Sequence, residues 1–246
     1  MFDTTAPIDT VPASLRTREL GAIDQVVLAN TIGNSDAVRR FAAGLGPQRA
    51  VASALAREFY PFCFDFSLFL AAAISHIRDE RARMLLVANL YEEHGDLDLS
   101  RIHPELFRAF VRALDLDPAA LEIGAGTAGA EAAARVTRIC RNGPAHRALA
   151  ALYAIELLFG PACELFTRGL EHLGLPAAAI EFFTLHSGAD VVHAEQLRTA
   201  LVTACKTSSD RSEALAVASE VGRMFFELFD RIASSREEQL ALAEAS

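Results

Sequence analysis

The sequence predicts an all-α protein, a bundle of packed helices, and three observations carry that prediction. Apolar residues recur at i, i+3, i+4 and i+7 along most of the chain, which is the period of a helix with a buried face. Ala, Leu, Arg and Glu, which are strong helix formers, dominate these stretches. No segment shows a sustained alternation of β-branched residues, which would indicate a half-buried strand.

Breaks in the apolar period divide the chain into a series of expected helices. Gly and Pro end helices and Ser, Thr or Asp begin them, so Asn142-Gly143-Pro144, Gly174 with Pro176, and Thr207 to Asp210 mark boundaries. The long helices carry apolar residues on more than one face and must therefore pack centrally. The expected helices cover residues 16–31, 35–43, 47–77, 79–93, 104–115, 127–141, 144–172, 176–206 and 209–236.

Length and composition favour a single domain over residues 1–246. Of these residues 52% are hydrophobic, so a large core is available, and no Ser/Gly/Pro-rich linker divides the chain. We expect residues 1–20 to form an irregular N-terminal arm and residues 237–246 to be frayed.

Charge and hydropathy exclude two classes of partner. The 23 Lys and Arg residues against 32 Asp and Glu give a net charge of −9 without a basic run, which argues against nucleic acid and anionic membranes. The longest apolar run, Phe66 to Ile77, is too short for the roughly 20 residues of a membrane span. The N-terminus does not resemble a signal peptide.

Four cysteines in no CxxC pair are expected to be reduced core residues, as in a cytoplasmic protein: Cys63, Cys140, Cys163 and Cys205.

The segment from Gly124 to Gly129 matches the GxGxxG pattern of dinucleotide-binding proteins. That pattern has meaning only after a strand and within a βαβ unit, and neither is predicted here. We interpret the segment as an interhelical loop, with Thr127 as a possible N-cap.

Three segments place ionisable residues in apolar helices, where an unpaired charge is costly. In the first, His186, Asp190 and His193 fall within about 60° on one helix face and could bind iron, manganese or zinc. A solvated polar stripe with a His–Asp hydrogen bond explains this segment equally well. In the second, Glu156 is the one charge between Ala148 and Cys163, which favours an inward-pointing carboxylate over a surface-edge Glu.

The third segment is an acidic helix end followed by a loop and a histidine that opens the next helix. It offers Glu93 and His103, whereas Glu92 and His94 are expected to be a solvated helix end. Taken together, the three segments supply Glu93, His103, Glu156, His186, Asp190 and His193. Three carboxylates and three imidazoles are enough ligands for two divalent ions, and the net positive centre could hold dioxygen or an anionic group. The chain lacks the Glu-x-x-His and HExxH motifs of two other metalloprotein classes.

In this arrangement the chain resembles the haem-oxygenase-like diiron oxidases and oxygenases. The resemblance rests on Glu-Glu-x-Gly followed by His-Pro-x-Leu-Phe, a mid-helix Glu, and His-x-x-x-Asp-x-x-His, over roughly residues 47–206. It implies a haem-oxygenase-like seven-helix bundle, here with an extra N-terminal helix. True haem oxygenase is disfavoured because it needs an early proximal histidine and the first histidine here is His76.

By resemblance, the six residues named above are iron ligands, with Glu156 bridging and Glu93 preferred over Glu92. Some N-oxygenating members have a further Glu on the early core helix, where this chain has Ser67 with Asp65 nearby. Asp65 is therefore an additional ligand, a substrate contact or a satisfied core acid. An aromatic stretch around Phe62, Phe66 and Phe69 lines the substrate pocket or is plain core. His76, His146 and His172 are expected to be surface or edge histidines.

The resemblance implies an oxidoreductase with two Fe(II) ions and O₂ as co-substrate, acting through a peroxo-diferric species on a small organic molecule. N-oxygenation of an amine is favoured, because Asp65 offers an anion to a cationic substrate, and oxidative C–C cleavage or decarboxylation is the alternative. A cofactor-free enzyme or a metal-binding helical protein on the same scaffold is the alternative of another class. An external electron donor, a homodimer and a cytoplasmic location are further expectations.

Overall fold

The computed structural model describes residues 21–123 and 127–234, and every regular element in those residues is helical. This confirms the all-α prediction. The helices are α2 (Gly21–Leu28), α3 (Asp36–Ala42), α4 (Gln48–Ile74), α5 (Glu80–Glu93), α6 (His103–Ala113), α7 (Pro118–Ile123), α8 (Ala128–Asn142), α9 (Ala145–Glu171), α10 (Ala177–Ala204) and α11 (Ser208–Ser234), with short 3₁₀ turns at η1 (Ile32–Asn34) and η2 (Gly95–Leu97).

Within the described ranges, seven of these helices have 11 or more residues, and two short ones, α2 and α3, precede them. The predicted seven-helix bundle with an additional N-terminal segment is therefore present. The expected boundaries agree to within a few residues where the structure describes them. The sequence does not predict helix α7, because its six residues are too few to show a helical period. The predictions for residues 1–20, 124–126 and 237–246 lie outside the described residues.

Side-chain caps explain where several helices begin. The hydroxyl of Ser35 accepts a hydrogen bond from the Val38 amide at the start of α3, and Asp79 accepts one from Ala82 at the start of α5. Thr127 accepts one from the Ala130 amide at 3.1 Å, so it is the N-cap of α8 as predicted.

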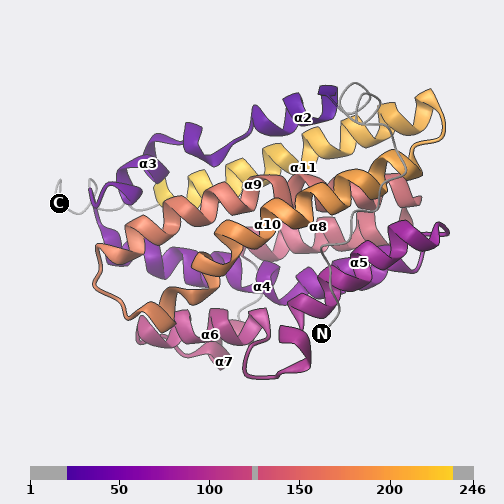
Figure 1. Cartoon of the computed structure of the whole chain (residues 1–246). Coiled ribbons are helices and arrows are strands. Elements are labelled where there is room, and N and C mark those ends of the chain that lie inside the picture. The colour runs from indigo at the N-terminus through magenta and orange to yellow at the C-terminus, as the bar shows by residue number, and fades with distance from the viewer. Residues whose placement is uncertain (1–20, 124–126, 235–246) are drawn as a thin grey trace.

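Helix α9 is the centre of the bundle and packs against α2, α3, α4, α8, α10 and α11. In Figure 1, α2 and α3 run along one side of the bundle and α6 and α7 along the opposite side, with α9 and α10 between them. By length and composition α9 could cross a membrane, but 78% of its most apolar window is buried inside the protein. Its apolar character is therefore accounted for by the core. The four cysteines are buried thiols, as predicted.

Aromatic rings fill the space where α4, α9 and α11 meet. Phe59 of α4 stacks on Phe159 of α9 at 5.0 Å between ring centroids, and Phe229 of α11 lies 5.2 Å from Phe59. Such ring pairs contribute roughly 0.5–1.5 kcal/mol each beyond their buried area. They hold α4 and α9 in register beside the polar residues described below.

Helices α4 and α8 cross at very close range at Gly129. A β-carbon at this position would lie 1.5 Å from the backbone oxygen of Glu58, which cannot move aside without shifting α4. A residue larger than glycine therefore forces the two helices apart.

We expect Gly129→Ala to lower the free energy of unfolding by about 1–3 kcal/mol or more, because it overpacks this crossing. Gly188→Ala is the matched control, since Gly188 is exposed in mid-helix, a β-carbon there would meet no atom within 4 Å, and alanine is the better helix former. Chemical denaturation of both variants measures the difference. Equal stability of the two variants would contradict the close crossing.

Candidate metal centre

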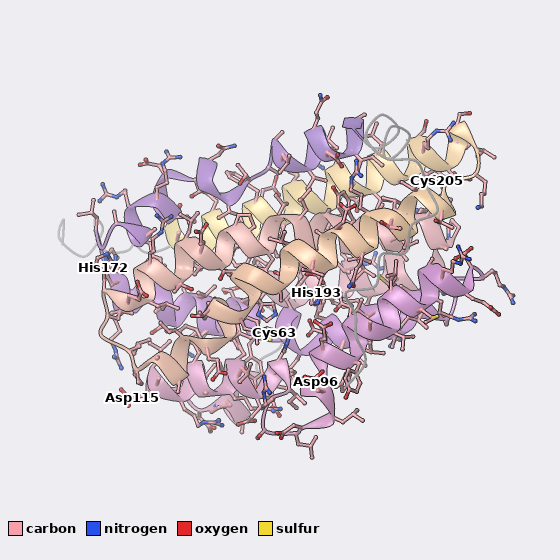
Figure 2. The ribbon with its side chains drawn as sticks, in the orientation of Figure 1. Cys63, Asp96, Asp115, His172, His193 and Cys205 are labelled. Atoms are coloured by element: carbon pink, nitrogen blue, oxygen red, sulfur yellow. The ribbon has the colours of Figure 1, made fainter. Side chains whose placement is uncertain are left out.

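The structure brings the six predicted ligand residues together as two buried groups of three. The first triad is Glu93, His103 and His186, and the second triad is Glu156, Asp190 and His193. Within each triad one ligand atom per residue lies within 4.8 Å of the others. Figure 2 shows His193 and Cys63 near the middle of the bundle, whereas His172, Asp115 and Cys205 lie at its ends.

A tight turn explains why Glu93 and His103 meet. Glu93 is the last residue of α5, and Gly95, Asp96 and Leu97 follow it with φ values of 59°, 56° and 68°. A β-carbon at Gly95 would lie 2.5 Å from the backbone of Arg101, so the chain returns on itself at this point. Helix α6 then begins at His103 with Pro in its first turn, directly beside the end of α5.

In the first triad, the ring nitrogen of His186 that can face a metal follows from the hydrogen bond of the other nitrogen. Nδ1 of His186 donates to the Phe182 carbonyl at 2.6 Å, which leaves Nε2 free to bind. Nδ1 of His103 lies 2.8 Å from Oε2 of Glu93, and the ring centroids of His103 and His186 are 4.5 Å apart. Burial and the neighbouring His103 lower the pKa of His186 to about 3. Burial alone would raise the pKa of Glu93, but His103 lowers it.

The second triad forms where α9 and α10 approach closely at Gly160, whose β-carbon position is 3.2 Å from Cβ of Asp190. Nδ1 of His193 lies 3.6 Å from Oε2 of Glu156 and 4.0 Å from Oδ1 of Asp190. Burial alone would lower the pKa of His193, but Glu156, Glu92 and Asp190 together raise it to about 11. Burial and Glu156 both raise the pKa of Asp190 well above its usual range.

Several buried polar atoms of the two triads have no hydrogen-bond partner, which indicates whether these residues suit a metal. Asp190 is 1% exposed, and neither of its carboxylate oxygens has a hydrogen-bond partner. Nδ1 of His103 and Nδ1 of His193 also have none, so the short contact of His103 with Glu93 is not an aligned hydrogen bond. Unpartnered buried acceptors cost about 1–3 kcal/mol each, and more when charged. Cations between them remove that cost, and mixed imidazole and carboxylate ligands suit iron, manganese or zinc. The residues fit two divalent ions.

An apolar pocket adjoins the first triad. Its lining residues are Phe59, Phe62, Cys63, Phe66, Glu93, His103, Ile155, Glu156, Phe159, Phe182 and His186. Phe62 and Phe66 therefore lie in the pocket wall, as one of the predicted alternatives required. Phe69 does not line it and instead packs behind Phe62, with 5.4 Å between the ring centroids.

Asp65 does not reach this pocket. A helix turns 100° per residue, so Asp65 projects about 100° away from its neighbour Phe66. It is half-buried, and although burial raises its pKa, Arg141 of α8 acts in the opposite direction. The additional-ligand and substrate-contact alternatives therefore receive no support from its position, because the residue lines no part of the pocket and belongs to neither triad.

Two polar residues beside the second triad were missed or misread from the sequence. Glu92 was expected to be solvated, but its Oε2 accepts a hydrogen bond from Nε2 of His193 at 2.9 Å. Asn89 was not singled out, and its Nδ2 donates to Oε1 of Glu156 at 3.0 Å. Helical spacing could have indicated both, since Asn89 lies one turn before Glu93 on the same face.

The expectation of surface or edge histidines holds for His76 and His172, which are exposed. It is wrong for His146, which is 7% exposed and lies 3.4 Å from a carboxylate oxygen of Glu213. His146 stands in the first turn of α9, and the N-terminal turn of α11 covers it.

Comparisons with known proteins agree with this geometry. The chain is 30% identical over 161 residues to a 4-aminobenzoate synthase of Chlamydia trachomatis, an alignment that covers 64% of this chain and 68% of that protein. A structure from Shewanella denitrificans, described as a domain of unknown function with a heme oxygenase-like fold, superposes with a TM-score of 0.70 at 19% identity over 96% of this chain and 97% of that one. A CADD-like protein of unknown function from Nostoc punctiforme gives a TM-score of 0.72 at 17% identity, over 91% and 99%. Both structural likenesses show the haem-oxygenase-like fold. The sequence profile of the iron-containing redox enzymes matches residues 53–225, a range that holds all six triad residues, and the chain belongs to that family.

Proposed function

We propose that the protein is a non-haem diiron oxidoreductase that uses dioxygen to oxidise a small aromatic substrate. The observation that carries the proposal is the buried Asp190 carboxylate with two unpartnered oxygens, between Glu156 and His193. The first triad lies beside the pocket and offers the other metal position. Membership of the iron-containing redox family supports iron as the metal.

Each part of the centre has a distinct role in the proposal. Two ferrous ions, when bound, would supply the site and part of the electrons for the reduction of dioxygen. The carboxylates of Glu93, Glu156 and Asp190 would offset three of the four positive charges, and Glu156, which borders the pocket as well as the second triad, would be shared between the two ions. The pocket's phenylalanine rings exclude water and hold the substrate against the first triad.

The pocket lining favours an uncharged aromatic substrate. Apart from the triad residues, the lining side chains given above are apolar or thiol, and they include no Arg or Lys. Because Asp65 is outside the pocket, an aliphatic ammonium would find no counter-ion there other than the triad carboxylates, whose charge the metals would offset. An aromatic amine is neutral at pH 7 and needs none, so N-oxygenation of an arylamine is the reaction that fits. Conversion of an amine to a hydroxylamine with one O₂ also forms water and consumes two electrons and two protons, which an external donor must supply.

The named relatives favour a second candidate, the formation of 4-aminobenzoate or a similar arylamine. The Chlamydia trachomatis relative is a 4-aminobenzoate synthase at 30% identity. A carboxylate product would find no cation in the described pocket wall other than the metals themselves. Oxidative C–C cleavage of an amino or fatty acid meets the same difficulty and is less well supported.

The diiron proposal is tested by anaerobic addition of Fe(II) to the metal-free protein, followed by oxygen. We expect about two irons per chain and oxygen uptake that depends on them. His186→Ala removes a ligand of the first triad and Glu156→Ala one of the second, so each should lower the iron content and abolish oxygen uptake while circular dichroism stays helical. His172→Ala, at an exposed end of the bundle, is the control. Absence of iron uptake by the parent protein would instead favour a cofactor-free enzyme.

We expect the buried carboxyl group of Asp190 to lower the stability of the metal-free protein. Its pKa is raised in the folded state, so the folded chain keeps a proton that the unfolded chain loses, and stability falls as pH rises above the usual Asp range. We expect metal-free Asp190→Asn to exceed the parent by about 1–3 kcal/mol at pH 8, with a smaller difference near pH 4. Adding Fe(II) should stabilise the parent more than the variant, because the variant lacks one ligand of the second triad but keeps the whole first triad. A variant less stable than the metal-free parent at pH 8 would count against an uncompensated carboxylate.

Substrate class is tested by two assays on the iron-loaded protein. With arylamines, a reductant and ¹⁸O₂, N-oxygenation predicts a product heavier by one labelled oxygen. Phe62→Ala, which opens the pocket wall, should raise KM for these amines. Phe69→Ala, which does not touch the pocket, should lower the stability of the protein and leave KM nearly unchanged. Growth rescue of a 4-aminobenzoate auxotroph without arylamine oxidation would replace this candidate with the second one.

A further inference from the structure

Helix α5 reaches both triads from one face. Asn89, Glu92 and Glu93 stand at i, i+3 and i+4, which places them side by side on the helix surface that packs against α10. Glu93 belongs to the first triad. The other two residues each make a hydrogen bond to a different member of the second triad.

Asn89 holds one oxygen of Glu156. Its side chain is 1% exposed, and Nδ2 donates to Oε1 at 3.0 Å across 67 residues of sequence. The other oxygen of Glu156, Oε2, is the one that faces Nδ1 of His193 at 3.6 Å. The carbonyl oxygen of Asn89 has no hydrogen-bond partner, so this buried amide gains little stability for the fold itself.

Glu92 holds the opposite edge of the His193 ring. Its Oε2 accepts from Nε2 of His193 at 2.9 Å, and 40% of the Glu92 side chain is exposed. A ring that donates from Nε2 presents Nδ1 toward Glu156 and Asp190 when neutral, and Nδ1 has no partner of its own. The hydrogen bond therefore selects both the orientation and the tautomer of the ring.

The first triad is held differently. His186 is oriented by the backbone carbonyl of Phe182, one turn earlier in its own helix, so its orientation does not depend on another element. In the second triad, two of three members depend on side chains of α5. The two halves of the centre thus differ in what fixes their geometry.

We propose that Asn89 and Glu92 are positioning residues for the metal of the second triad, a role that rests on the proposed diiron function. Asn89 directs Oε2 of Glu156, and Glu92 directs Nδ1 of His193, toward the same point beside Asp190. Hydrogen-bond partners of this kind typically change metal affinity about 10- to 100-fold when removed.

The experiment is an anaerobic calorimetric titration of the metal-free protein with Fe(II) alone, without substrate or oxygen. The parent should bind two ions. Glu92→Ala and Asn89→Leu should each bind the first ion with parent-like affinity and the second about 10- to 100-fold more weakly. Glu92→Gln should keep most of the affinity for the second Fe(II) ion, because the amide oxygen of Gln can still accept a hydrogen bond from Nε2 of His193.

Glu195→Ala is the control, because Glu195 is an exposed carboxylate on α10 that belongs to neither triad. Thermal melts of the metal-free variants show whether the fold is kept. Two binding steps with parent-like affinity in both variants would overturn the positioning role and leave the diiron proposal standing. An equal loss of affinity in both steps would also overturn the positioning role, because the effect would not be confined to the second triad. If the parent itself takes up no iron, the diiron function fails first.

Discussion

The arrangement depends on the burial of three carboxylates and three imidazoles in an otherwise apolar bundle. Glu93, Glu156 and Asp190 are at most 4% exposed, and moving such groups out of water is unfavourable unless opposite charge and hydrogen bonds compensate. The histidines compensate part of this cost: His103 lowers the pKa of Glu93, whereas burial and Glu156 raise that of Asp190 in spite of His193. The uncompensated cost of burial is greatest at Asp190, and bound divalent cations would remove that cost.

The surrounding core fixes the geometry that this charge cluster requires. Glycine at position 160 lets α9 and α10 approach closely enough for Glu156 and Asp190 to share one site, and the turn after Glu93 brings His103 back to the end of α5. Rings from α4, α9 and α11 then hold α4 at its distance from α9 and leave space beside the first triad. Packing and polarity are therefore coupled, since the same helices build the pocket and position the ligand residues.

Much of this could be predicted from the sequence, because its main signals are local. Helical period and Gly/Pro breaks predict most helices, and the lone charge at Glu156 predicts an inward carboxylate. The grouping of six residues into two triads could not be derived from period alone, since it depends on how α5, α6, α9 and α10 meet. The three alternatives for Asp65 stayed open for a similar reason: its aromatic neighbours indicate burial, but only the packing of α4 against α8 shows which way it faces. Glu92 is 40% exposed at its helix end, as expected, but its bond to His193 was not predicted, because a residue there can be both solvent-exposed and bonded to a buried ring.

The two triads differ in their surroundings, and the difference follows from one residue. Glu156 lines the apolar pocket together with Glu93, His103 and His186, yet its second oxygen faces His193. Asp190 and His193 do not line the pocket, and His193 instead meets solvent through the half-exposed Glu92. A substrate in the pocket would therefore contact the first triad directly and the second triad only through Glu156. Protons or electrons that enter from solvent by way of Glu92 would reach the second triad first. The centre therefore has an apolar side at the pocket and a polar side at Glu92.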